Sequence, residues 1–335
     1  MKKRRRLILD FEEIINSIRT FKGVTRKSSI ADVREKLKDV YNISGNVHLA
    51  FGDDAAAIDI GDNKLMLLAT DGIWGPLMDI NPRWAGYCSV LVNVNDIAAM
   101  GGIPMGMTNV LSSSDSEVTS QIMEGINEGV KKFGVPMVGG HTHPDTPYDA
   151  LDVAISGIVD KDAVIPSCGA QVGDNVIIAI DLDGQVYPGT EINWDTTSDK
   201  TPEYVQDQIK VMNTIGKKHL VNAAKDISNP GAVGTLGMLL EASSKGADID
   251  LELIPKPEDM DWISWFKMYP GSAFVISAPE KSTDKVIDLL NKTHIDAACV
   301  GTITDTKKLN MSYKNDKRTV FDFNSEIIMG FSEDK

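Results

Sequence analysis

Short continuous apolar runs and longer stretches with apolar residues at helical spacing succeed one another along the chain. Two such runs, Ala55–Ile60 and Leu65–Ala69, flank the polar segment Gly61–Asn63. Glycine, aspartate and asparagine tolerate the positive φ angles that tight turns require, so the two runs are expected to pair as a β-hairpin. Asp54 lies just before the first run and Asp71 just after the second. The hairpin therefore predicts that these two carboxylates meet at one edge of a sheet.

Helices alternate with strands over the rest of the chain. Asp10 precedes apolar residues at helical spacing and is a suitable N-cap for a first helix that stops near Gly23. A second helix is predicted to end at about Tyr41. Further helices are predicted over Pro82–Met100, over Ser116–Phe133, over Glu203–Ala224, from after Gly231 to about Gly246, and over Thr283–Asn291. Further strands are predicted at Met105–Leu111, Val135–Val138, Ala150–Val159, Asn175–Ile180, Ala273–Ser277 and Ala297–Ile303. This alternation predicts an α/β protein.

The length of the chain predicts two domains. A chain of 335 residues exceeds the size at which a single hydrophobic core usually stops growing. We place the boundary near Pro166, because a short connector follows it and a strong strand begins at Asn175. The predicted domains are residues 1–166 and 167–335.

Composition and charge exclude several classes of partner. Hydrophobic residues make up 42% of the chain and charged residues 24%, and the formal net charge is −14. Nucleic acids and anionic membranes are bound through clustered Lys and Arg, so neither is an expected partner. ATP remains compatible with this acidity, because its phosphates usually arrive with Mg²⁺ as a bridge.

The cysteines and the N-terminal segment indicate the cellular compartment of the protein. Cys88, Cys168 and Cys299 are odd in number and far apart, so no disulfide framework is expected and a reducing cytoplasm fits. The basic segment Lys2–Arg6 precedes an apolar stretch that is too short for a signal peptide, and we expect it to be solvated. No uninterrupted apolar run approaches the length of a membrane span. The sequence therefore predicts a cytoplasmic protein without a membrane partner.

The adjacent carboxylates Asp53 and Asp54 are the first candidates for chemistry. Two like charges about 4 Å apart repel by roughly 4 kcal/mol at an effective dielectric constant near 20. A folded protein keeps such a cluster where a cation or a strong hydrogen-bond donor lies beside it. For this pair taken alone, a solvated Asp-rich turn is the alternative.

Two further stretches could approach a phosphate group. The segment Gly23–Ile30 is basic and rich in small residues, and Arg26 or Lys27 could reach an anion from it. A solvated loop is the alternative there. Asp226 precedes a glycine-containing turn that opens a helix, and the N–H groups and dipole at such a helix start favour negative charge.

The segment Gly139–His143 ends a predicted strand. Its histidines, His141 and His143, would point the same way on a strand and could hold Zn²⁺, but no cysteine or third histidine lies near them in sequence. For the two glycines, a plain strand-ending turn is the alternative.

Together, seven short motifs resemble the superfamily of aminoimidazole ribonucleotide (AIR) synthetase, selenophosphate synthetase and thiamine-monophosphate kinase. They are GDDAA at Gly52–Ala56, TDG at Thr70–Gly72, NVNDIAAMGGIP at Asn93–Pro104, GGHT at Gly139–Thr142, SGIV at Ser156–Val159, VGD at Val172–Asp174 and KDIS at Lys225–Ser228. The motifs occur in the superfamily's order and cover nearly the whole chain. A narrower likeness, carried by GVTRKSSI at Gly23–Ile30 and VPMVGGHTH at Val135–His143 among others, is to the AIR synthetase-related group that includes methanogenesis marker protein 2.

The resemblance implies a fold, a cofactor and a set of site residues. The fold would be the two-domain, PurM-like α/β (α+β) fold, in which an N-terminal mixed sheet pairs with that of a second subunit to form a barrel. The cofactors would be ATP and Mg²⁺, and the assembly a homodimer. The implied metal ligands are Asp54, Asp71, Asp96 and Asp226, with Asp53 as a neighbour. The implied nucleotide contacts are Lys27, Asp71, Asn93, Gly139, Gly140, His141 and Thr142, and the implied catalytic residues are Lys27 and Asp54.

The resemblance leaves the phosphoryl acceptor open. Selenide chemistry is doubtful, because the functional Cys or selenocysteine of selenophosphate synthetase has no counterpart in Gly23–Arg26. The loop Gly184–Thr201, with Tyr187, Glu191 and Trp194, is either an acceptor-binding segment or a variable surface loop. The leading hypothesis is an ATP- and Mg²⁺-dependent phosphotransferase, ligase or cyclase acting on a small molecule or a maturation substrate. The alternatives are a nucleotide-binding accessory protein without turnover and a metal-dependent hydrolase without nucleotide specificity.

Overall fold

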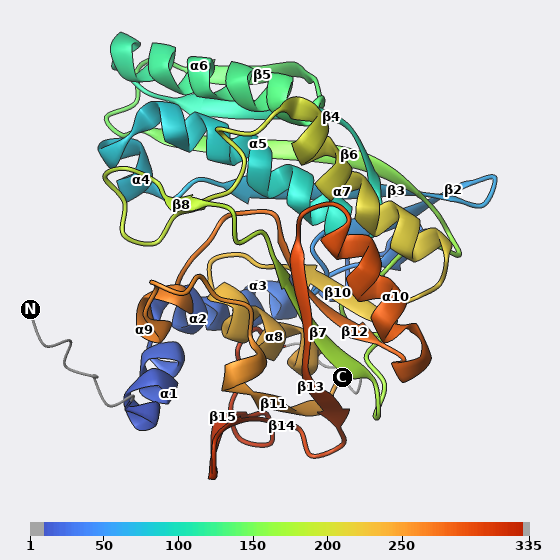
Figure 1. Ribbon diagram of the computed structural model, residues 1–335. Helices are drawn as coiled ribbons and strands as arrows, with labels where there is room; N and C mark the ends of the chain where they lie inside the picture. The colour runs from blue at the N-terminus through green and yellow to red at the C-terminus, as the bar shows by residue number, and fades with distance from the viewer. Residues whose placement is uncertain (1–9, 331–335) are drawn as a thin grey trace, which may run out of the picture.

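Two large mixed β-sheets, a small two-stranded sheet and the helices around them form the described part of the chain, residues 10–330, in a computed structural model (Figure 1). The basic segment Lys2–Arg6 lies outside the described residues. Within residues 10–330, no helix combines the length and the apolar character that crossing a membrane requires.

The first sheet contains the predicted hairpin. Its strands, in spatial order, are β1 (Val47–Leu49), β2 (Ala56–Gly61), β3 (Lys64–Gly72), β6 (Ala150–Asp160), β4 (Ile103–Ser112) and β5 (Met137–His143). Only the β4–β5 pair is parallel. Asp62 and Asn63 adopt φ angles of 50° and 56° between β2 and β3, so the predicted turn is confirmed.

Helices cover one face of the first sheet and leave the other open. α5 (Pro82–Ala99) packs against β3 and β6, and α6 (Ser116–Phe133) packs on α5 (Figure 1). Strand register puts Leu68 and Val110 on the same face as the β6 residues opposite them, and their side chains are 45% and 40% exposed. Because groups of exposed apolar side chains often mark protein–protein contacts, this face is a candidate for contact with another chain.

The second sheet is covered by helices on both faces. Its strands, in spatial order, are β10 (Ala223–Asp226), β12 (Ala273–Ala278), β7 (Asn175–Ile180), β13 (Asp296–Thr304), β11 (Gly246–Asp250), β14 (Lys308–Tyr313) and β15 (Asp316–Asp322). Side chains alternate along β7, so Ile177 packs with α7 (Pro202–Lys217) and α10 (Glu280–Asn291) in the core shared with the first sheet. Ile178 points the opposite way, to a second core under α8 (Gly231–Ala242).

The N-terminal helices pack on the second sheet rather than the first. α1 (Phe11–Arg19) begins at the predicted N-cap, whose side chain accepts a hydrogen bond from the Glu13 N–H at 3.1 Å, and its apolar face joins the core under α8. The sequence predicts this helix as part of the first domain, residues 1–166, but in the structure the helix packs with the second sheet. An amphipathic pattern shows that a face is buried but not which surface buries it. The boundary near Pro166 stays a proposal.

Several predicted elements differ from those in the structure. The basic segment around Gly23–Ile30, for which a loop was expected, is helical instead. It forms two tight helical turns, α2 (Lys22–Thr25) and a 3₁₀ turn (Arg26–Ser28), followed by α3 (Ser29–Leu37). The helix predicted as far as Ala224 ends at Lys217, and its last residues form β10. Gly246 does not cap a helix, since it begins β11. The remaining elements are α4 (Gly75–Ile80), α9 (Trp262–Trp265), a 3₁₀ turn (Leu251–Leu253), β8 (Gln185–Val186) and β9 (Trp194–Asp195).

Candidate active site

Three carboxylates from separate elements converge between the two sheets. Asp54 precedes β2, Asp96 lies in α5 and Asp226 ends β10. One oxygen from each lies within 4.8 Å of the others, and we call these residues the acid cluster. The acid cluster lines a cavity of about 550 Å³, the acid cavity, together with Asp53, Asp71, Lys27 and Lys225.

Local structure explains how each member of the acid cluster reaches this point. The hairpin brings Asp54 to the edge of the first sheet that faces the second. Asp96 is on a helix whose residues are almost all buried, so its carboxylate is enclosed by protein as well. Asp226 ends the edge strand β10, and its backbone N–H donates to Asp54 Oδ2 at 3.3 Å.

A buried lysine is paired with the acid cluster. Lys225 forms an ion pair with Asp54, and these two side chains are only 3% and 5% exposed. Its ammonium also donates to the Ser167 hydroxyl at 3.2 Å and to the Gly52 carbonyl at 3.3 Å. Lys225 therefore supplies positive charge where the acids are most crowded.

Asp53 and Asp71 lie on the borders of the acid cluster. Asp53 accepts a hydrogen bond from the Ser167 N–H at 2.5 Å, and burial raises its pKa to about 6. Burial likewise raises the pKa of Asp71 to about 6, although the positive charge of Lys27 opposes that rise. Burial lowers the pKa of Lys27, although the nearby Asp71 acts against it. Lys27 and Asp71 therefore line the same cavity and lie near enough for their charges to interact.

The acid cavity has more acids than bases. Five aspartates face two lysines, and burial followed by mutual repulsion raises the pKa values of Asp96 and Asp226 well above the usual range. A divalent cation would relieve this repulsion. Carboxylate oxygens from three separate segments of the chain are the hard donors that Mg²⁺ prefers, so the acid cluster fits this ion. Lys27 could then contact an anion held by the metal.

The two halves of the chain each match a family model. The AIR synthase related protein N-terminal domain matches residues 52–159, and the corresponding C-terminal domain matches residues 171–314. The chain belongs to the AIR synthase-related family. An uncharacterized protein of Methanocaldococcus jannaschii is 46% identical over 323 residues, which cover 96% of this chain and 100% of that protein. A thiamine-monophosphate kinase of Buchnera aphidicola is 28% identical, over 85% of this chain and 92% of that enzyme.

Solved structures confirm the fold. Thermotoga maritima PurL complexed with FGAR matches 95% of this chain with a TM-score of 0.76 and 16% identity. This chain spans about half of that PurL chain, 54%. AaThiL complexed with AMPPCP and TMP matches 85% of this chain and 96% of its own, with a TM-score of 0.62 and 17% identity. The predicted superfamily and its two-domain α/β fold are thus confirmed, whereas the narrower likeness to methanogenesis marker protein 2 stays a prediction.

Some residues expected at the site of this AIR synthase-related protein lie away from the acid cavity within one chain. Asn93 is fully buried in α5, where its side-chain amide donates to the Ser89 carbonyl at 2.9 Å. Gly139, Gly140, His141 and Thr142 are exposed on β5, at the opposite edge of the first sheet from β1. Neither group lines the acid cavity. Strand register places His141 beside Val110, on the open face of the sheet.

Within the loop Gly184–Thr201, residues 193–197 are buried in the protein and the rest is at least partly exposed. Tyr187 stacks on Trp84 with ring centroids 3.9 Å apart, and the buried Trp194 meets Trp265 edge to face. Glu191 is exposed. Two of the three residues proposed for acceptor binding therefore have structural contacts, which explains their aromatic character without a ligand.

Sequence reasoning missed three residues of this region. Lys225 belongs to the KDIS motif, and its position next to Asp226 is the signal that could have identified it. Ser167, which contacts both Asp53 and Lys225, carried no such signal because it lies in the connector between the halves. Asn229 also lines the acid cavity.

Proposed function

We propose that this protein is an ATP- and Mg²⁺-dependent enzyme that uses the γ-phosphoryl group of ATP to phosphorylate or activate a small molecule or a maturation substrate. The observation that carries the proposal is the convergence of the acid cluster beside Lys27 in one cavity. The thiamine-monophosphate kinase and selenide, water dikinase relatives support ATP-dependent chemistry in this family. Mg²⁺, when bound, would neutralise charge on the phosphates and on the developing transition state.

Different residues of the acid cavity would bind the metal and the phosphates. Asp54, Asp96 and Asp226 would hold the metal, with Asp71 and Asp53 as flanking ligands. Lys27 would hold the phosphate tail by charge. The enclosure of the acid cluster between the two halves would keep water from the transferring group.

The exposed strand β5 fits a nucleotide contact made across a subunit pair. The glycines of Gly139–Thr142 and His141 lie at the open face and edge of the first sheet. In a homodimer formed through that face, these residues of one subunit could reach the nucleotide of the other. Asn93, being fully buried, would then act by holding α5 in place.

Calorimetric titration with a non-hydrolysable ATP analogue tests the proposal. We expect binding that requires Mg²⁺ and weakens at least tenfold in Asp54→Asn and Asp96→Asn. The matched control is Asp62→Asn, which removes an exposed carboxylate at a positive-φ turn position that asparagine also tolerates. The metal role would be refuted if the analogue bound equally tightly with and without Mg²⁺. It would also be refuted if Asp54→Asn and Asp96→Asn bound the analogue as tightly as the control Asp62→Asn.

A second candidate function is a nucleotide-binding accessory protein without turnover. The lining of the acid cavity alone supports both functions, since binding and turnover need the same ligands. ADP release separates them, because the enzyme should release ADP faster when a suitable acceptor is added. If nucleotide binds but no acceptor from a metabolite panel accelerates ADP release, the accessory function is favoured.

A further inference from the structure

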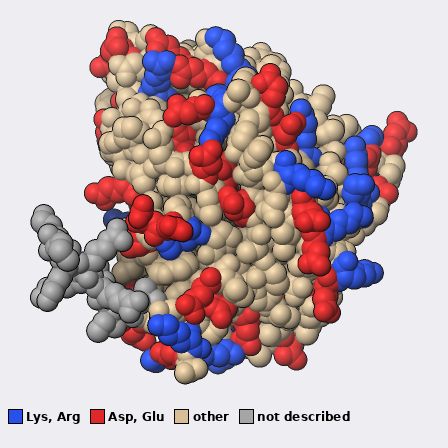
Figure 2. All heavy atoms as spheres, viewed as in Figure 1, with Lys and Arg blue, Asp and Glu red and all other residues tan. Residues whose placement is uncertain are grey.

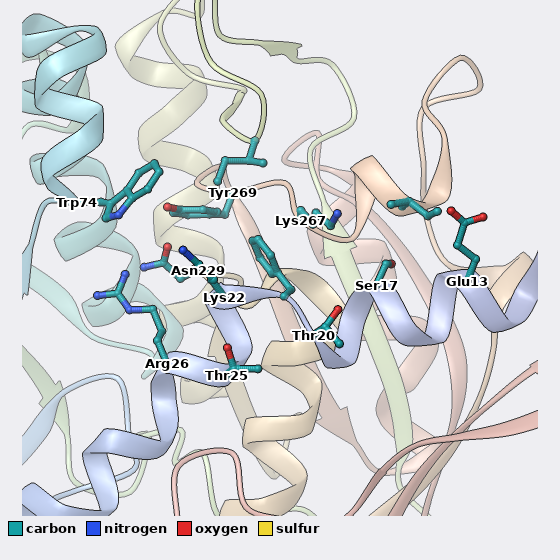
Figure 3. A pocket seen from close by; sticks show the side chains of 14 residues that line it. Glu13, Ser17, Thr20, Lys22, Thr25, Arg26, Trp74, Asn229, Lys267 and Tyr269 are labelled. Carbon is teal, nitrogen blue, oxygen red and sulfur yellow. The ribbon is translucent and has the colours of Figure 1, made fainter.

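A second and larger cavity lies next to the acid cavity. It has a volume of about 1000 Å³ and is lined by residues of α1, of the α2 turn and of the segment that follows α9, and by Trp74, which directly precedes α4 (Figure 3). We call it the aromatic pocket, because Phe21, Trp74 and Tyr269 line it. Neither the family motifs nor the acid cluster includes these three residues.

The aromatic pocket is predominantly cationic. Lys22, Arg26 and Lys267 line it, against a single acid, Glu13. Figure 3 shows Trp74 and Arg26 at one end, with Tyr269 next to them, while Glu13 lies at the far end on α1. Arginine binds carboxylate and phosphate groups through a planar fork, and flat aromatic faces bind flat rings by stacking. One end of the pocket therefore presents both kinds of contact together.

Trp74 is unusually exposed for its size. Its side chain is 46% exposed, whereas Trp84, Trp194 and Trp265 are almost completely buried. Exposing a large indole to water forgoes the free energy of its burial, about 25 cal/mol for each Å² of apolar surface. A ligand that covers the indole would recover part of that free energy.

The aromatic pocket and the acid cavity share a wall. Asn229 lines both cavities, and the consecutive residues Arg26 and Lys27 each line one of them. A Cβ on Gly23 would lie 2.1 Å from the Asn229 carbonyl oxygen, so the α2 turn is pressed against this wall. Trp74 is only three residues beyond Asp71. A molecule in the aromatic pocket would thus lie next to the acid cavity.

We propose that the aromatic pocket binds a small anionic molecule that carries a flat ring, with the ring against Trp74 and Tyr269 and the carboxylate or phosphate at Arg26. Resting on the proposed function, we assign this molecule as the second substrate of the enzyme. The charges fit this assignment, because the neighbouring acid cavity holds more acids than lysines and would repel an anion that had no cations of its own.

Binding of four probe types to the purified full-length protein tests the proposal. Phenyl phosphate and benzoate combine a ring with a charge, benzyl alcohol has only the ring, and methyl phosphate has only the charge. By calorimetry, we expect one of the ring anions to bind at least tenfold more tightly than either incomplete probe. The ranking of phenyl phosphate against benzoate distinguishes a phosphate from a carboxylate ligand. Equal affinities for all four probes would overturn the proposal.

Two variants locate the binding. Trp74→Leu and Arg26→Gln should each weaken binding of the preferred ring anion at least tenfold. Tyr148→Leu, which removes another exposed aromatic ring outside both cavities, is the control and should leave that affinity unchanged. Unchanged binding in Trp74→Leu would place the ligand elsewhere and overturn the proposal.

A parallel titration separates this proposal from the proposed function. Trp74→Leu should still bind the ATP analogue with Mg²⁺, because Trp74 does not line the acid cavity. Nucleotide binding without ring-anion binding would refute the aromatic pocket alone. Ring-anion binding that depends on Trp74, without any nucleotide binding, would refute the proposed function and the assignment as its second substrate, and would uphold the ligand class.

Discussion

At the scale of single residues, Lys225 balances the charge of the acid cluster. Its ammonium is enclosed with Asp54, and it also contacts Ser167 and Gly52, so it joins both halves of the molecule. Desolvation lowers the pKa of Lys225, but the facing aspartates outweigh that effect and the pKa is raised. The lysine is therefore charged at neutral pH and partly offsets the repulsion among the acids.

Replacing Lys225 with methionine should destabilise the metal-free protein. Loss of one partner of a buried ion pair leaves an uncompensated charge and typically costs about 3–5 kcal/mol. We expect a fall of that order in the free energy of unfolding, measured by urea denaturation with EDTA. Added Mg²⁺ should restore part of the loss, because the cation would compensate the same acids.

The matched control is Lys161→Met. Lys161 pairs with Asp59 at 2.6 Å, but both side chains are more than a third exposed, at 41% and 34%. Surface pairs of this kind contribute less than about 1 kcal/mol. A loss in Lys225→Met no larger than that in Lys161→Met would show that Lys225 does not stabilise the cluster.

At the scale of elements, the α2 turn lies against the wall that the two cavities share. Gly23 lies where this turn meets the segment before α8, and a side chain there would contact the Asn229 carbonyl oxygen at 2.1 Å and the Phe21 ring at 2.6 Å. The backbone oxygen cannot move away freely. The close approach keeps Arg26 and Lys27 facing their separate cavities.

Gly23→Ala should therefore displace the turn and weaken nucleotide binding. We expect at least a tenfold loss of affinity for the ATP analogue with Mg²⁺, because Lys27 would move with the turn. Gly75→Ala is the control, since nothing lies within 4 Å of its added Cβ. If calorimetry gave the two variants the same affinity, the position of the turn would not matter for the nucleotide.

At the scale of the whole molecule, charge and apolar surface are distributed differently. On the face that Figure 2 shows, Lys and Arg are interspersed with Asp and Glu and form no single extended basic patch among the described residues. The open face of the first sheet exposes apolar side chains instead, including Leu68 and Val110. Surfaces of this kind are typical of contacts between protein chains.

Val110→Lys should disrupt a homodimer formed through this face. A charge in the centre of an apolar interface would be desolvated without a partner, so we expect a shift toward monomer in sedimentation equilibrium. Nucleotide affinity should fall with it if β5 of one subunit completes the site of the other. Ile43→Lys is the control, because Ile43 is 85% exposed and lies outside the first sheet. A wild-type protein that is monomeric at micromolar concentration would contradict the prediction.

Much of the local structure of this protein was determined by the sequence alone. The two short apolar runs around Gly61–Asn63 predicted a hairpin, because its turn residues accept positive φ and its apolar strands need burial. The N-cap at Asp10 was likewise readable from residue type and local spacing. Asp54, Asp96 and Asp226 could be named together only through the resemblance of their motifs to the superfamily, and the structure brings these three acids together.

Other features were decided only by the tertiary structure. A short segment such as Ala223–Asp226 has no decisive period, and it became an edge strand because β12 offered hydrogen-bond partners. The amphipathic α1 could have covered either sheet, and packing selected the second. The pairing of Lys225 with Asp54 joins residues 171 positions apart, and the aromatic pocket brings Glu13, Trp74 and Tyr269 together from distant segments. Local sequence fixes the backbone preference of each segment, but contacts between distant segments exist only once the whole chain has packed.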